Sequence, residues 1–335
     1  MKSQPSLARH LESFFHQRLT KQRNATRATV TAYRDALRLL VLFASEQTGK
    51  QPCALAVEDI DRDMVLAYLD HLERSRGNGV HTRNARLTAI RSFFRHVAAS
   101  DPALIGIAQR VLSIPCKKSD VPTTGYLSRA ELEALLNAPS KNSVHGRRDR
   151  VLLLFLARTG ARVSEALGVD AADLVLDGAR SQVLLRGKGR KQRVIPLSCD
   201  LVAAIESLLR ERGIARHEPL PVFVGAREVR LTRFGATHIV RRAVTAVSNQ
   251  MPELARKEVS PHIFRHSLAM TLLQSGVDLL TIQAWLGHAQ IATTHRYAAA
   301  DTEMMRRGLE KAAIQGTGGH RFQPKDAVLS LLESL

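Results

Sequence analysis

The sequence predicts a mainly α-helical protein of the α+β type, with a helical N-terminal domain and a mixed, mostly helical second domain that holds a small antiparallel sheet. Three observations predict this fold class. Apolar residues recur at helical spacing along most of the 335 residues. A single pair of strand-like segments flanks a glycine-bearing turn in the second half. A segment with two prolines and a glycine separates the two halves.

Residues 1–112 are predicted to form the helical domain, because apolar stripes fall within 7–19, 29–44, 61–73 and 82–97. In the last stripe, Leu87, Ile90, Phe94 and Val97 share one face. Arginines lie elsewhere along this segment, and those predicted to contact a nucleic-acid backbone are Arg83, Arg86, Arg91 and Arg95. A solvated helix face would show the same pattern, so this segment alone leaves both interpretations open.

Residues 113–125 are the predicted linker, and residues 126–314 the predicted second domain. Ser128 and Glu131 have the spacing of a capping box, which predicts a helix start. An apolar helix is expected over residues 149–158. Gly160 is expected to end that helix and a new one to begin near Arg162, where free backbone N–H groups also favour an anion.

A basic hairpin is expected next. Residues 182–185 and 193–195 have strand character and flank the turn R-G-K-G-R-K-Q. No acidic residue stands within this segment, whose cations are Arg186, Lys188, Arg190, Lys191 and Arg193. Contact with phosphates is the general interpretation, and Lys188 between two glycines could also donate a proton. Helices are then predicted over residues 198–212 and 233–247.

Consecutive short helices are predicted from Ser260 to Tyr297. His262 and Arg265 stand three residues apart and share one face of the first helix, and Gly276 is expected to end that helix. The next helix takes its apolar positions from Leu279, Leu280, Ile282 and Trp285, and Gly287 stops it before His288. A third short helix, from residue 289, is expected to carry Tyr297.

Lys and Arg exceed Asp and Glu by 18, and the pI is about 10.7, so a polyanionic partner such as nucleic acid is expected. The 3 cysteines are widely spaced and suggest neither a disulfide framework nor a CxxC metal site. The sequence shows no signal-peptide core or apolar run long enough for a membrane span, so a cytoplasmic, nucleoid-associated protein without a membrane partner is expected.

The cluster of His262, Arg265, His288 and Tyr297 suits attack by a phenol on a phosphodiester. A phenol with a pKa of about 10 needs help to lose its proton, and fixed positive charge supplies that help and binds phosphate oxygens. His262 and His266 could instead seat a metal, but Ile263 and Phe264 replace the glutamate that a zinc-protease helix requires. No metal or other cofactor is expected.

Six residues in this order and spacing closely resemble the tyrosine recombinases, also called the phage integrase family, and most of all their compact Xer-type and transposon-encoded members. The matching motifs are T-G-A-R-V-S-E with Arg162, the G-K-G turn with Lys188, H-I-F-R-H with His262 and Arg265, L-G-H with His288, and Tyr297 nine residues later. Residues 7–100 also resemble that family's helical core-binding domain.

This resemblance implies a site-specific recombinase that needs neither metal nor ATP and acts in DNA integration, transposition or resolution of mobile elements. Tyr297 would form a 3'-phosphotyrosyl intermediate, Arg162 and Arg265 would bind the non-bridging oxygens, and Lys188 would protonate the leaving 5'-oxygen. His262 would assist proton transfer and His288 would hydrogen-bond the phosphate. Three alternatives remain open: an enzyme that relaxes DNA strands as a type IB topoisomerase does, a non-catalytic DNA-binding protein, and a hydrolase with a metal held by histidines.

The partners implied by the resemblance are double-stranded DNA with paired half-sites and further copies of this chain, as a dimer on each site and a tetramer on two sites. Accessory recombination proteins are a further expectation. Residues 315–335 are predicted to form a tail that begins with a glycine-rich stretch and ends in a short apolar helix over 327–335. That helix is expected either to dock on its own domain or to be exchanged between subunits.

Overall fold

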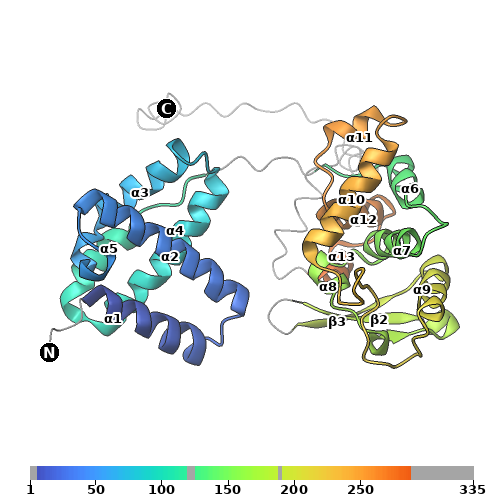
Figure 1. The fold of residues 1–335 in the computed structure, drawn as a ribbon, viewed down its shortest axis with the longest axis horizontal. Coiled ribbons are helices and arrows are strands. Elements are labelled where there is room, and N and C mark those ends of the chain that lie inside the picture. Colours follow the sequence, from blue (N-terminus) through green and yellow to red (C-terminus); the bar gives the residue numbers. More distant parts are fainter. Residues whose placement is uncertain (1–5, 119–124, 188–190, 288–335) are drawn as a thin grey trace, which may run out of the picture. The chain divides into compact units, whose positions relative to one another are not determined.

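The computed structural model describes residues 6–118, 125–187 and 191–287. The chain forms two compact units, Met1–Pro122 and Thr123–Leu335, each with its own hydrophobic core. Within the described ranges the protein is mostly helical with one small antiparallel sheet (Figure 1), which confirms the predicted fold class. The boundary between the units falls inside the segment predicted as the linker.

The first unit is a helical bundle. Its elements are α1 (Ser6–Ser13), the π-helix η1 (Phe14–Gln22), α2 (Arg27–Thr48), the 3-10 turns η2 (Pro52–Ala54) and η3 (Val57–Asp59), α3 (Arg62–Arg74), α4 (Val80–Ser100), η4 (Pro102–Leu104) and α5 (Ile105–Leu112). The four predicted helices are all present. The helix α5 was not predicted, because Pro102 and Gly106 suggest a loop. It nonetheless packs on α4 and buries Ala108 and Val111.

The core of the first unit is aromatic at its centre. Phe14 lies edge-on to Phe93, with ring centroids 5.6 Å apart, and Tyr68 is 1 % exposed. All four apolar residues predicted for the α4 face are fully buried, namely Leu87, Ile90, Phe94 and Val97. Ile114 joins the same core, so the packed part of this unit extends beyond residue 112.

The second unit surrounds the buried helix α7 (Val144–Thr159). Its other elements are α6 (Arg129–Asn137), α8 (Val163–Ala166), η5 (Ala171–Asp173), β1 (Leu174–Val175), η6 (Gly178–Arg180), β2 (Gln182–Arg186), β3 (Gln192–Pro196), α9 (Cys199–Glu211), α10 (Arg233–Val247), α11 (Pro252–Arg256), α12 (Pro261–Gln274) and α13 (Leu279–Leu286). Helices α6, α9 and α12 pack directly on α7. The sheet lies at one end of this unit, beside α9 (Figure 1).

The sheet has the order β1-β2-β3, with both pairings antiparallel. The strands β2 and β3 agree with the predicted hairpin, Val183 pairs with Ile195, and Val183, Leu185 and Ile195 are buried in the core. The two-residue strand β1 was not predicted, because so short a segment carries no alternating pattern. The hairpin is closed by a hydrogen bond from the Gly187 N–H to the Lys191 carbonyl at 2.7 Å.

Local sequence signals account for most helix ends in this unit. Ser128 and Glu131 form the predicted capping box of α6. Gly160 ends α7 and Gly287 ends α13, both in the left-handed conformation that glycine tolerates best. Ser260 precedes α12 and Pro261 fills its first helical position, both as predicted, but the Ser260 side chain makes no capping hydrogen bond. In α13, Ile282 is buried whereas Leu280 is 65 % exposed, so Leu280 is not one of its packed positions.

Candidate active site

Arg162 is placed by a tight turn between two helices. Gly160 ends α7 with a φ of 62°, and Arg162 follows in an extended conformation as the N-cap of α8. A β-carbon on Gly160 would lie 2.8 Å from the Leu286 side chain and 2.9 Å from that of Leu268. Glycine is therefore required here both for the backbone conformation and for the close approach of α12 and α13.

Glu165 is buried beneath Arg162 and binds two arginines. It accepts hydrogen bonds from the Arg162 backbone N–H at 2.8 Å, from Arg162 Nη1 at 2.8 Å and from Arg193 Nη2 at 2.7 Å. Burial alone would raise the pKa of Glu165, but the hydrogen bonds from Arg193 and Arg162 and the charge of Arg193 outweigh it and lower the pKa to about 2. The carboxylate is thus ionised at neutral pH.

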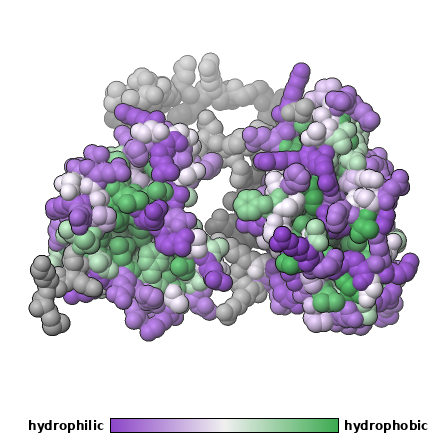
Figure 2. Space-filling model, viewed as in Figure 1, coloured by the Kyte–Doolittle hydropathy of each residue, from purple (hydrophilic) through white to green (hydrophobic). Residues whose placement is uncertain are grey.

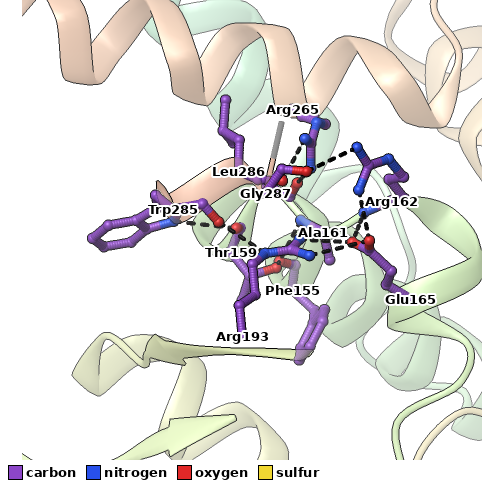
Figure 3. A network of polar contacts seen from close by, with 11 residues as sticks. Phe155, Thr159, Ala161, Arg162, Glu165, Arg193, Arg265, Trp285, Leu286 and Gly287 are labelled. Atoms are coloured by element: carbon purple, nitrogen blue, oxygen red, sulfur yellow. Dashed lines mark hydrogen bonds and ion pairs between the residues drawn. The ribbon is translucent and has the colours of Figure 1, made fainter. Parts of the chain in front are cut away.

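Arg193 connects the sheet to α13. Its Nε donates to the Trp285 carbonyl at 2.9 Å, and the Trp285 indole N–H donates to the Thr159 carbonyl at 3.2 Å. With the pair to Glu165, these contacts join β3, α8, α13 and the end of α7 into one polar network (Figure 3). Sequence reasoning predicted Arg193 as a DNA contact and missed this network.

Arg265 is 4 % exposed and reaches across two helix ends. Its Nη1 donates to the Gly160 carbonyl at 2.8 Å and its Nη2 to the Leu286 carbonyl at 2.5 Å. Arg162 Nη2 donates to the next carbonyl, that of Gly287, at 3.3 Å. Carbonyls at helix C-termini lack intrahelical partners and carry partial negative charge, so they suit guanidinium donors. The two arginines therefore meet at the end of α13 (Figure 3).

His262 lies one turn before Arg265 on α12, and its side chain is exposed, as a group that meets a ligand must be. Partial burial of its ring and the charges of Arg265, Arg233 and Arg162 lower the pKa of His262. The lowered pKa favours the neutral imidazole, which can accept a proton.

Arg162 and Arg265 meet at the backbone of Leu286 and Gly287, and the charges of both arginines act on His262, three residues before Arg265 on α12. The other residues predicted for this chemistry, Lys188, His288 and Tyr297, lie outside the described residues. In the sequence, His288 directly follows Gly287, and Lys188 directly follows Gly187, where a β-carbon would lie 3.0 Å from Glu165 Oε1.

The predicted DNA-contact arginines of α4 differ in their surroundings. Arg95 is exposed and Arg86 is half-buried. Arg83 is only 4 % exposed and lies 3.5 Å from Glu73 of α3, a contact within the bundle. Arg91 donates to the Leu112 carbonyl at 2.7 Å and so holds the end of α5. The geometry gives Arg83 and Arg91 structural partners, whereas Arg95 is open to solvent.

On the hairpin, Lys191 is exposed, and Arg190 lies outside the described residues. Although the hairpin itself contains no acid, acidic side chains reach it from other elements. Arg186 pairs with the buried Asp173, with Nη1 donating to Oδ2 at 2.7 Å, and Arg193 pairs with Glu165. Sequence spacing could not reveal these partners, because they come from distant parts of the chain.

Two further features bear on the site's chemistry. Within the described ranges, no group of three or more His, Cys, Asp or Glu residues lies together in a way that could hold a metal ion. In the same residues, no helix is long and apolar enough to cross a membrane.

Two guanidiniums and a neutral imidazole at one helix junction form a site able to bind a phosphate. Comparison with known proteins agrees with this chemistry. Residues 125–304 match the model of the phage integrase family, and residues 11–100 match the phage integrase N-terminal SAM-like domain. The chain belongs to the phage integrase family. It is a tyrosine-type site-specific recombinase, an enzyme that cleaves and rejoins DNA strands through a covalent phosphotyrosyl intermediate.

Individual relatives cover most of the chain. The Sinorhizobium fredii protein named "Putative integrase/recombinase y4rD" is 62 % identical over 78 % of this chain and 93 % of its own. Tyrosine recombinase XerC of Pelobacter propionicus is 32 % identical over 89 % of this chain and 93 % of its own. The solved structure of XerH recombinase bound to a palindromic difH substrate has the same fold, with a TM-score of 0.68 and 23 % identity over 94 % of this chain and 91 % of that one.

Proposed function

We propose that Tyr297 attacks a DNA phosphodiester whose phosphate sits against Arg162 and Arg265. The observation that supports this most directly is the meeting of both guanidiniums at the backbone of Leu286 and Gly287, the first two residues of the L-G-H motif. Charge developing on the non-bridging oxygens would be stabilised by these two fixed cations. Arginine suits this role because its planar fork binds two oxygens and stays protonated.

In the proposed reaction the phenolic oxygen of Tyr297 forms a bond to phosphorus, and the bond from phosphorus to the 5'-oxygen breaks. The phenol's proton passes to neutral His262, and Lys188 gives a proton to the leaving 5'-oxygen. His288 hydrogen-bonds the phosphate. The product is a 3'-phosphotyrosine and a free 5'-hydroxyl, and the reverse steps on a new 5'-hydroxyl rejoin the strands. Because the phosphotyrosyl bond preserves the energy of the cleaved bond, no ATP is required. Because the fixed cations stabilise the charge on the phosphate, no metal is required either.

Among the described cations, the exposed Arg95 and Lys191 are the side chains we propose to contact the DNA backbone, and the half-buried Arg86 is a further proposed contact. Arg186 pairs with Asp173 but keeps a side chain that is 53 % exposed, so it can contact a phosphate through its outer face. For Arg83, Arg91 and Arg193 we propose a structural role and not direct DNA contact, because each already has a partner within the protein.

We also propose that the chain acts as a dimer on each recombination site and as a tetramer on two sites of double-stranded DNA, in the movement or resolution of a mobile element. The link to a mobile element is supported by a solved structure of similar fold, the Tn1549 transposon integrase in complex with transposon right end DNA, with a TM-score of 0.68 over 90 % of this chain. Accessory recombination proteins and exchange of residues 315–335 between subunits are part of the same proposal.

The central test is a comparison of the chain with Tyr297→Phe on DNA from its own genomic surroundings. Nicked fragments trap the intermediate, because the short 5'-hydroxyl strand diffuses away. We expect the unchanged chain to form a covalent protein–DNA adduct at one position, also in EDTA, and Tyr297→Phe to bind the same DNA without any adduct. An adduct that survives in Tyr297→Phe would place the nucleophile elsewhere.

The assembly is tested by removal of residues 316–335. We expect cooperative binding to paired half-sites to weaken much more than binding to one half-site, because exchange matters only between neighbouring subunits. Equal losses on both DNAs would refute the exchange.

A supercoil-relaxation assay on DNA without a recombination site separates recombination from general strand relaxation, which should be slow.

A further inference from the structure

Phe234 is the most exposed large apolar side chain among the described residues, at 89 %. It is the second residue of α10, whose first turn is fixed by a hydrogen bond from the Gly235 N–H to the Thr232 hydroxyl at 3.1 Å. The buried face of this helix consists of Ala236, Ile239, Val240, Ala243 and Val247. At about 100° per residue, Phe234 is turned roughly 200° away from Ala236, so it cannot join the core.

The surroundings of Phe234 are basic. Helix α10 contains no acidic residue, and Arg233, His238 and Arg241 are all exposed. His238 and Arg241 follow Phe234 by four and seven residues, so they extend the same exposed face. On the face of the second unit that Figure 2 shows, hydrophobic residues lie in small patches among hydrophilic ones. An aromatic ring on a cationic, acid-free helix is complementary to a polyanion that also offers an apolar group.

The start of α10 lies beside the candidate active site. Helix α10 packs on α8, whose N-cap is Arg162, and on α12, which contains His262 and Arg265. The charge of Arg233, in the first turn of α10, is one of those that lower the pKa of His262. A duplex whose phosphate occupies the site would therefore present its neighbouring base pairs to the first turn of α10.

We propose that Phe234 reads base sequence next to the cleaved phosphate by packing on the 5-methyl group of a thymine in the major groove. This inference rests on the proposed function, because it requires the phosphate to bind at Arg162 and Arg265. The major groove is wide enough for a helix, and the thymine methyl is the apolar group on its floor. An exposed aromatic side chain at the tip of a basic helix has the chemistry to distinguish that methyl from the other base edges.

The test uses the DNA fragment on which the unchanged chain forms its adduct, with each thymine near the cleaved bond replaced in turn by deoxyuridine. Deoxyuridine lacks only the methyl group. At one position we expect the unchanged chain to bind roughly tenfold more weakly after the replacement, within the range for a specific base contact. Phe234→Ala should bind the thymine DNA about as weakly and show no further loss with deoxyuridine. Phe234→Leu, which keeps an apolar side chain, should retain part of the difference.

Leu280→Ala provides the matched control, because Leu280 is also an exposed apolar residue, at 65 %, but lies on α13. This variant should remain as sensitive to deoxyuridine as the unchanged chain. The inference is overturned if no thymine position is sensitive, if Phe234→Ala keeps the sensitivity, or if Phe234→Ala weakens only cooperative binding to paired half-sites. Adduct formation is scored separately, so a chain that forms no adduct at all would refute the proposed function instead.

Discussion

Glu165 and Arg193 form a buried ion pair that joins helix α8 to strand β3, with side chains only 2 % and 13 % exposed. Both terminal nitrogens of Arg193 take part, since Nη1 donates to Glu165 Oε1 at 3.1 Å and Nη2 to Glu165 Oε2 at 2.7 Å. The same carboxylate binds Arg162. The basic hairpin and the proposed phosphate-binding arginine are therefore held by one acidic side chain.

The first prediction concerns loss of this carboxylate. Glu165→Ala leaves two guanidiniums without their counter-charge in a buried place, so we expect the free energy of unfolding to fall by about 3 kcal/mol. Adduct formation should fall more than DNA binding, because Arg162 loses its support. Denaturant unfolding followed by circular dichroism measures the first effect. Glu133→Ala is the control, since Glu133 pairs with Arg129 on the exposed side of α6 and should change stability by less than about 1 kcal/mol.

The second prediction concerns acid. The pKa of Glu165 is lowered from 4.5 to about 2, so its ionised form stabilises the folded state. This stabilisation is fully present above pH 4.5 and is lost as the pH falls from there towards 2, with a total of about 3 kcal/mol. Unfolding measured from pH 6 to pH 3 should show a shallower decline for Glu165→Gln than for the unchanged chain. Parallel declines would contradict the assignment.

The third prediction concerns His262, whose pKa is lowered by partial burial and by Arg265, Arg233 and Arg162. Arg233→Gln removes one of these charges, so the pKa of His262 should rise towards its ordinary value of 6.5. A histidine NMR titration measures it, with the resonance assigned from its absence in His262→Gln. Arg158→Gln should leave the pKa unchanged, because Arg158 pairs with Asp200 on α9. An unchanged pKa in Arg233→Gln would show that Arg233 is not a neighbour.

The fourth prediction separates backbone strain from crowding at Gly287. Gly287 and Gly276 both have positive φ, 64° and 82°. A β-carbon on Gly276 would meet nothing within 4 Å, whereas one on Gly287 would lie 3.1 Å from Arg193 Nη1. Gly276→Ala should therefore cost about 1 kcal/mol from the backbone alone. Gly287→Ala should cost more and also reduce adduct formation, because it displaces Arg193. Equal effects on stability and adduct formation would refute the contact.

Much of this fold follows from local sequence signals. The prediction of a helix over 233–247 agrees with α10, because its apolar residues recur at helical spacing. The ends of α7 and α13 were predictable from Gly160 and Gly287, since few other residues adopt a left-handed conformation without strain. The placement of Arg162, His262 and Arg265 near one another came from their motifs, and the structure brings these three together.

Partners that are distant in sequence could not be predicted. Glu165 and Arg193 are 28 residues apart, and Arg193 and the Trp285 carbonyl 92 apart, so no periodicity connects them. The burial of Arg83 depends on Glu73 arriving from α3, which a helical pattern in α4 does not show. For the same reason the basic hairpin looks unpaired in the sequence, although Asp173 and Glu165 neutralise two of its arginines.

Arg162 and Arg265, the two guanidiniums proposed to bind the phosphate, donate to main-chain carbonyls of Gly160, Leu286 and Gly287. Every amino acid has a backbone carbonyl. At Leu286 the position of the bound guanidinium therefore depends on the path of the backbone more than on the identity of the side chain. Phe234, the proposed base-reading residue of α10, is not among these residues. With Arg233 kept for its effect on His262, randomising Phe234, His238 and Arg241 would therefore test whether the enzyme can be retargeted to a new DNA sequence with its strand-exchange residues unchanged.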